Sequence, residues 1–252
     1  MIVSRLRGRF LICLFACTMP ATAAKAYSLT EHRRITDQAI ANFNFCFNGA
    51  LTADLSDYVQ TADRNEDLNL LRKWTLFSHF FHPEKALLDQ RRMSSDYRIA
   101  DLQETIRNLL GESGNQGLAD AFYELGHAIH HIQDMASPPH VVPVMHGLFD
   151  SYEGWKPSTF DYPSLHLDKA YCRDLAAKPL KGALYGLFVE TARATIANVR
   201  GPLTIWLNGA RRETSWEAFW LESDKPAFGQ YGYLGDHFGE QSFQASDQKW
   251  VW

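Results

Sequence analysis

The fold is decided by residues 117–140, GLADAFYELGHAIHHIQDMASPPH. Apolar side chains recur in this stretch with the spacing of one helix face, and a Ser-Pro-Pro sequence then stops the pattern, which predicts a helix over residues 117–135. A sector of about 100° on this helix carries four polar residues, His127, His130, His131 and Asp134. That sector has too many imidazoles for an ordinary core stripe and indicates a site of chemistry.

The rest of the chain has the same helical spacing and lacks a convincing run of alternating polar and apolar residues. The predicted fold class is therefore all-α. Further helices are predicted over residues 29–44, 51–62, 97–112, 144–153 and 178–209, the last with a break at Gly201-Pro202.

The chain has 252 residues, 46% hydrophobic and 21% charged, which is enough to bury a sizeable core. We expect one helical domain over residues 27–210 and an aromatic-rich tail over residues 211–252 that packs on it; the alternative is a tail that dips into lipid. Without residues 1–26 the chain has 21 basic and 29 acidic residues, a net charge of −8. This charge does not provide the basic field of nucleic-acid-binding proteins, so we expect no stable nucleic-acid partner. We also expect a monomer.

Residues 1–26 have the organisation of a secretory signal peptide. Basic residues without any acid precede an apolar run over residues 10–19, and an A-x-A cleavage site ends at Ala26. The apolar run is much shorter than the roughly 20 residues needed to span a bilayer. We therefore expect a secreted or periplasmic protein that starts at Tyr27, and lipid attachment at Cys17 is the alternative.

Two cysteines, Cys46 and Cys172, remain after the signal peptide is removed. In an oxidising compartment they can form a disulfide, which would stabilise the fold by roughly 4 to 5 kcal/mol in the chain-entropy model. Two buried free thiols fit the sequence equally well, so the pairing stays open at this point.

Five of the ten histidines fall within 20 residues: His127, His130, His131, His140 and His146. His130 and Asp134 are one helical turn apart, and His146 and Asp150 repeat this spacing. Imidazole and carboxylate ligands without thiolates are typical of a catalytic zinc site. The H-E-x-x-H helix of metalloproteases is absent. The alternatives are a structural metal site or surface histidines.

Three other stretches accompany the spacings His130-x3-Asp134-x5-His140 and His146-x3-Asp150. They are residues 31–40, EHRRITDQAI, residues 61–63, Thr-Ala-Asp, and residues 78–83, SHFFHP. Taken in this order, the stretches resemble the bacterial zinc-dependent phospholipase C family and its relatives, the three-zinc single-strand nucleases. The resemblance covers residues 27–210.

The resemblance implies a mostly helical domain that binds about two to three zinc ions in a cleft. When the residues are matched to the family by position, one zinc would be coordinated by Asp63, His79, His130 and Asp134. A second takes His140, His146 and Asp150. A third takes His32, Asp134 and the α-amino nitrogen and carbonyl of Tyr27, which signal cleavage would expose as a ligand.

The implied reaction is hydrolysis of a phosphodiester, in which Asp63 is the candidate general base or orienter of the attacking water. We expect a phospholipase C that acts on phospholipids at membrane surfaces and releases diacylglycerol and a phosphorylated headgroup. Arg64 is the candidate substrate-binding residue, because it stands where the best-known lipases of this family have a choline-binding aromatic. An arginine there favours an anionic or less selective headgroup.

Other features favour the nucleases. The Tyr27-x4-His32 spacing and the closing Asp150 match them, whereas the short gap between His140 and His146 matches the lipases. The alternatives to a phospholipase C are therefore a single-strand zinc nuclease and a secreted zinc-binding or lipid-binding protein without turnover.

Overall fold

The computed structural model of the chain describes residues 29–68, 79–85, 94–111, 115–144, 170, 172–173, 183–207, 210–225, 228–234 and 243–245. Most of these residues are helical, which confirms a predominantly helical fold. The main helices are α2 Leu29–Cys46, α3 Ala53–Leu68, α6 Ser95–Gly111, α7 Asn115–Asp134, α8 Pro138–Val141 and α11 Ala183–Val199. None of the helices in this part of the chain has the length and apolar character that crossing a membrane requires.

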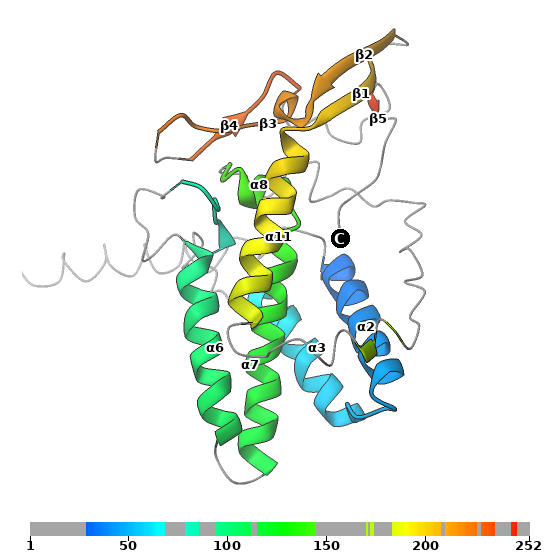
Figure 1. Cartoon of the computed structure of the whole chain (residues 1–252), viewed down its shortest axis with the longest axis vertical. Helices are drawn as coiled ribbons and strands as arrows, with labels where there is room; N and C mark the ends of the chain where they lie inside the picture. The colour runs from blue at the N-terminus through cyan, green and yellow to red at the C-terminus, as the bar shows by residue number, and fades with distance from the viewer. Residues whose placement is uncertain are drawn as a thin grey trace, which may run out of the picture.

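Helix α7 is the centre of the bundle, with α6 on one side and α3 on the other (Figure 1). Its two faces differ in character. Ala128 and, just past the helix end, Met135 are fully buried in the hydrophobic core. His130 follows Ala128 by two residues, a rotation of about 200° around the helix, and so lies on the opposite face, against α2 and α3. Helix α7 therefore separates an apolar core from a polar cluster.

The hydrophobic core fills the space between α6, α7, α11 and the segments that follow α11. Its fully buried members include Ile99 and Leu102 of α6, Phe188 and Ile196 of α11, and Ile205, Phe219 and Trp220. Because Phe219 and Trp220 come from the aromatic-rich tail, this part of the tail belongs to the same core as the helices. Tyr233 of the tail is 72% exposed, and the aromatic residues after Leu234 lie outside the described side chains.

Gly126 allows α3 and α7 to approach closely. A Cβ at this position would lie 2.3 Å from the carbonyl oxygen of Val59 and 2.7 Å from the Cβ of Ala62. Any side chain would therefore push α3 away, and the polar residues of α3 could not reach those of α7.

The segment after α11 corrects the predicted helix over residues 178–209. Helix α11 ends at Val199, and residues 202–207 form a strand. Pro202 cannot donate the amide hydrogen bond that a helix needs. The side chains of Leu203 and Ile205 are buried on either side of the half-buried Thr204, which is the alternation of a strand.

Two small antiparallel sheets cap one end of the bundle (Figure 1). The first has the order β2-β1-β5 and consists of Ala210–Ser215, Pro202–Leu207 and Phe243–Ala245. A short 3-10 helix, η2 Trp216–Ala218, connects β2 to the second sheet, which pairs β3 Trp220–Leu221 with β4 Gln230–Tyr231.

Other helix boundaries differ less from the predictions. Helix α3 continues six residues beyond the predicted end at residue 62, to Leu68. The helix predicted over residues 144–153 lies outside the described residues, apart from Val144.

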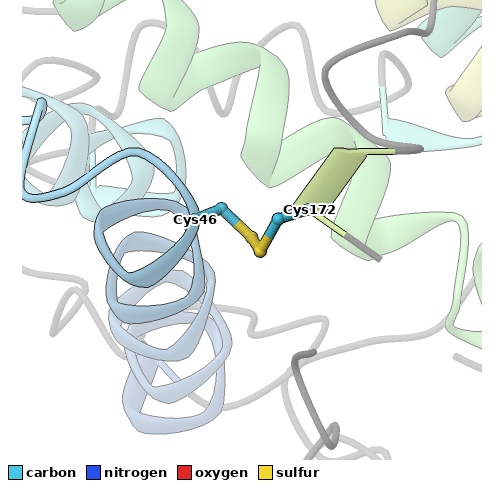
Figure 2. The surroundings of a disulfide bond; sticks show 2 residues. All are labelled: Cys46 and Cys172. Atoms are coloured by element: carbon cyan, nitrogen blue, oxygen red, sulfur yellow. A yellow bond between two sulfur atoms is a disulfide. The ribbon is translucent and has the colours of Figure 1, made fainter. Parts of the chain in front are cut away.

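Cys46 and Cys172 form a disulfide between residues 126 positions apart in the sequence (Figure 2). The bond attaches the end of α2 to the chain around residue 172. It decides the question that the sequence leaves open and removes both thiols of residues 27–252 as metal ligands.

Candidate metal centre

Helices α2, α3 and α7 each present two polar side chains one turn apart. They are His32 and Thr36 on α2, Asp63 and Asp67 on α3, and His130 and Asp134 on α7. Residues four apart on a helix lie on the same face, and all six of these side chains are buried. The three faces meet in one cluster because Gly126 lets α3 and α7 come close.

A short segment between α3 and α6 supplies His79. The amide of Phe81 donates to the carbonyl of His140 at 3.1 Å, and the amide of Ser95 donates to the carbonyl of Phe80 at 2.9 Å. These bonds fix the segment between α8 and the start of α6. The imidazole of His79 donates from Nδ1 to Asp134 Oδ2 at 2.7 Å.

The ligand atoms of the cluster form overlapping groups. His32, His130 and Asp134 form one, Asp67, His79 and His130 a second, and His79, His131 and Asp134 a third; within each group the atoms lie within 4.8 Å of one another. His130 is at the centre of the first two. The rings of His32 and His130 stack with centroids 4.2 Å apart.

Three carboxylates surround His130. Its Nδ1 lies 3.3 Å from Asp63 Oδ1, and its Nε2 lies 3.5 Å from Asp134 Oδ2 and 3.7 Å from Asp67 Oδ1. Neither nitrogen has a hydrogen-bond partner among the described residues, and neither do Asp63 Oδ1, Asp67 Oδ2 and Asp134 Oδ1. Buried polar atoms are rarely left in this state unless they bind an ion or water. The cluster therefore fits a cation coordinated by nitrogen and oxygen.

The pKa values of His130 and Asp134 show that the cluster stabilises positive charge next to its carboxylates. Burial alone would lower the pKa of His130, but the carboxylates of Asp134, Asp67 and Asp63 raise it to about 10. Conversely, burial would raise the pKa of Asp134, but His130, His140 and His79 hold it well below its usual range. A proton on His130 and a metal ion would compete for the same electron pairs.

His32 behaves differently, because burial and the neighbouring His130 lower its pKa. This imidazole is therefore neutral at pH 7, which is the form that binds a metal.

His140 lies at the edge of the cluster. Its Nδ1 donates to the backbone carbonyl of His79 at 2.8 Å and lies 4.0 Å from Asp134 Oδ2. The ring stacks on Phe80 with centroids 5.2 Å apart. His140 therefore holds the segment that carries His79, and it stands beside the three ligand groups rather than within one.

Glu66 binds the two remaining histidines of α7. Its Oε2 lies 2.6 Å from His127 Nδ1, and its Oε1 lies 3.3 Å from His131 Nε2. Burial would raise the pKa of Glu66, but the two histidines lower it strongly, so the carboxylate is ionised and can only accept hydrogen. Nε2 of His131 faces this carboxylate without a hydrogen bond among the described residues, and its Nδ1 lies 3.0 Å from the hydroxyl of Ser95.

This arrangement separates His131 from His130. Burial lowers the pKa of His131 to about 4, so the ring is neutral, and its Nδ1 already has a hydrogen bond with Ser95, whereas neither nitrogen of His130 has one among the described residues. Although His131 is close enough for the third ligand group, its hydrogen bond with Ser95 favours a supporting role, and His130 is the better ligand.

The structure brings together six of the residues that the sequence predicts for the site: His32, Asp63, His79, His130, Asp134 and His140. Asp63 contacts His130 but belongs to none of the three ligand groups. Arg64 follows Asp63 on α3 and has an exposed side chain. Tyr27, His146 and Asp150 lie outside the described residues.

Four site residues are absent from the sequence prediction: Thr36, Glu66, Asp67 and Gln133. A signal for Asp67 exists, because Asp63 and Asp67 have the same spacing as His130 and Asp134, but the predicted helix ended before it. Thr36 and Gln133 have no signal of this kind, since their role depends on contacts between α2 and α7.

Comparisons of the chain with protein-family models, with curated proteins and with solved structures found no match. The fold and the site themselves define a helical bundle with buried histidines and carboxylates that could hold a metal ion.

Proposed function

We propose that the protein is a secreted zinc-dependent phosphodiester hydrolase of the phospholipase C type, and that the histidine-carboxylate cluster is its metal centre. The observation that carries the proposal is the surroundings of His130. Three buried carboxylates, Asp63, Asp67 and Asp134, surround an imidazole whose two nitrogens make no hydrogen bond in the described part of the chain. Such a concentration of buried negative charge is costly unless a cation balances it.

The donor types support zinc. The cluster offers imidazole nitrogen and carboxylate oxygen, a mixture that is common in catalytic zinc sites. Cys46 and Cys172 are joined in a disulfide and offer no thiolate. The disulfide also agrees with export to an oxidising compartment, which the signal-peptide pattern of residues 1–26 predicts.

Zinc bound by these residues would supply Lewis acidity toward the phosphodiester oxygens and make water a better nucleophile. Asp63 would orient that water or accept its proton. The hydroxyl of Thr36 donates to Asp63 Oδ2 at 2.7 Å, so Oδ1 is the oxygen that can accept a proton. As the water oxygen bonds to phosphorus, the bond from phosphorus to the glycerol oxygen breaks, and diacylglycerol takes up a proton as it leaves.

The rest of the chain supports the substrate class. A net charge of −8 after the signal peptide disfavours a polyanion such as single-stranded DNA. Arg64 follows Asp63 on α3, and its cationic side chain is exposed. It can therefore bind the headgroup of a lipid at the protein surface. The nuclease and the non-catalytic zinc-binding protein remain as the competing functions.

A parallel assay separates these functions. The mature protein would be tested on phosphatidylcholine vesicles, phosphatidylglycerol vesicles and single-stranded DNA, before and after dialysis against a chelator and after return of zinc. We expect zinc-dependent release of diacylglycerol, with Asp101→Asn, an exposed carboxylate on α6, as an active control. Hydrolysis of DNA alone would identify a nuclease. Zinc binding without hydrolysis of any substrate would identify a binding protein.

A further inference from the structure

A chain of buried hydrogen bonds connects α2, α3 and α7 behind the ligand cluster. Thr36 donates to Asp63 Oδ2 at 2.7 Å, Gln133 Nε2 contacts Thr36 Oγ1 at 2.8 Å, and Gln133 Oε1 contacts His32 Nδ1. Thr36, Asp63 and His32 are each at most 2% exposed, and Gln133 is 6% exposed. None of these bonds is used by the proposed reaction except the one on Asp63.

The direction of this chain follows from its carboxylate end. An ionised Asp63 can only accept, so the hydrogen of the Thr36 hydroxyl points to Oδ2. Because a hydroxyl has one hydrogen, Thr36 must accept from its other partner. That partner is therefore the amide NH₂ of Gln133, and the carbonyl Oε1 of Gln133 must face His32.

The orientation of Gln133 determines the tautomer of His32. Oε1 can only accept, so His32 carries its proton on Nδ1 and its lone pair on Nε2. Nε2 is the nitrogen that lies 3.6 Å from Asp134 Oδ1. The lone pair of His32 Nε2 then faces the carboxylate oxygen Asp134 Oδ1. Two such groups repel each other, and a cation between them would stabilise the arrangement.

We infer that Gln133 is a positioning residue of the proposed metal centre: it fixes the tautomer of His32 and, through Thr36, reserves Oδ1 of Asp63 for the metal or the water. The inference rests on the proposed function, because it assigns a role to residues behind the ligands of that site. It also explains why an amide, which has a donor and an acceptor at fixed positions, stands beside Asp134 on α7.

Substitutions at Thr36 test the relay without removing a ligand. Thr36→Val has nearly the same shape but no hydroxyl, so the Gln133 amide loses its closer acceptor and keeps only the backbone carbonyl of His32, 3.5 Å from Nε2, which orients it more weakly. Thr36→Ser keeps the hydroxyl. Thr195→Val is a matched control, because Thr195 is also buried on a helix and its hydroxyl contacts the backbone carbonyls of Met135 at 2.8 Å and Thr191 at 3.1 Å rather than a side chain of the cluster.

The readouts are the tautomer of His32, from long-range hydrogen-nitrogen NMR spectra of histidine-labelled mature protein, and the zinc Kd from chelator competition. We expect an Nδ1-protonated His32 in the wild type, Thr36→Ser and Thr195→Val. Thr36→Val and Gln133→Met should give mixed tautomers and about 10- to 100-fold weaker zinc binding, the usual range for partners behind the ligands.

Two results would overturn the relay: a wild-type His32 protonated on Nε2, or a Thr36→Val protein with the wild-type tautomer. If the wild type binds no zinc, the proposed function fails. The tautomer comparison between Thr36→Val and Thr36→Ser still decides the relay in that case, since it does not depend on zinc.

Discussion

The two oxygens of Asp134 have different surroundings. Oδ2 accepts a hydrogen bond from His79 Nδ1 at 2.7 Å, and Oδ1 lies 3.6 Å from His32 Nε2. One carboxylate thus stands between side chains from α2, from the segment before α6 and from α7 itself. A residue in this position can balance the charge of more than one cation, which is the bridging role that the phospholipase C resemblance implies.

Asp134→Asn should therefore abolish the centre while preserving the shape of the side chain. We expect a loss of at least one metal ion and a fall in phosphodiester hydrolysis of more than about 100-fold, beyond what substitutions behind the ligands cause. Metal analysis and initial rates would be measured beside Asp101→Asn, which changes an exposed carboxylate. Equal metal content and activity in the two variants would show that Asp134 is not a ligand.

The different contacts of His130 and His131 on α7 predict opposite consequences for these adjacent histidines. His130→Ala should lose metal and activity, because it removes the imidazole at the centre of two ligand groups. His131→Ala should keep the metal but lower the free energy of unfolding by about 3 to 5 kcal/mol, because it leaves Glu66 buried with one partner fewer. Metal content and urea denaturation distinguish the two. A His131→Ala protein that has lost its metal while His130→Ala retains it would reverse the assignment.

At the scale of elements, the sequence predicts what depends on local pattern. Helix α7 and its polar sector follow from spacing alone, and Asn115–Asp134 agrees with the prediction. The strand over residues 202–207 differs from the predicted helix, although Asn208-Gly209 between two β-rich segments is a strong hairpin signal. Apolar spacing from α11 was extended past Pro202, where the pattern changes from a helical to an alternating one.

The end of α3 differs from its prediction for a related reason. Residues 63–68, DRNEDL, are too polar to continue an apolar stripe. They remain helical because Asp63, Glu66 and Asp67 are buried against the histidines of α7 and α2. Their partners are far away in sequence, so local pattern cannot reveal them.

The close approach of α3 and α7 gives a prediction for Gly126. Gly126→Ala should lower the free energy of unfolding by about 1 to 3 kcal/mol and weaken zinc binding, because the new methyl group overlaps the backbone of Val59. Gly186→Ala on α11 is the control. It has open space around it, so the substitution should stabilise the helix by about 0.5 to 1 kcal/mol. Denaturation midpoints and zinc Kd would be compared, and wild-type values for Gly126→Ala would contradict the packing.

At the scale of the whole molecule, a polar cluster connects the bundle to its β-cap. Glu222, after β3, accepts hydrogen bonds from Arg200 at 2.8 Å and from Lys85 at 2.8 Å, and it contacts His82 at 3.1 Å. These residues come from three separate parts of the chain. Hydrogen bonds from Arg200, against the effect of burial, lower the pKa of Glu222 from 4.5 to about 2.

This lowered pKa predicts the sign of a pH effect. The contribution of Glu222 to stability is fully present above its unfolded pKa of 4.5 and is lost as the pH falls toward 2. Glu222→Gln should therefore be about 1 to 2 kcal/mol less stable than the wild type at neutral pH. This value is smaller than the full pKa shift would give, because Arg200 is partly exposed and solvent screens its interaction with Glu222. The difference should shrink below pH 4.5.

Urea denaturation of both proteins across this pH range provides the measurement. Glu213→Gln is the control, because Glu213 and Arg211 form an ion pair in which both side chains are 64% exposed. A Glu222→Gln difference that is constant with pH, or that grows toward acid, would contradict the assignment.

Part of the site depends on contacts between residues that are far apart in the sequence. His32 and Gln133 are 101 residues apart, and their contact depends on the packing of α2 against α7. The types and order of the histidines and carboxylates in the cluster could be predicted because each occurs in a short motif. The hydrogen bonds that orient them could not, because they arise only when the three helices are assembled.

Metal analysis of the purified mature protein, with a matched activity measurement, tests whether the buried cluster is a zinc centre required for activity. We predict about two to three zinc ions per chain, loss of activity in proportion to zinc removed by a chelator, and recovery when zinc is returned. A metal-free preparation that hydrolyses phosphodiesters at the full rate would contradict the claim.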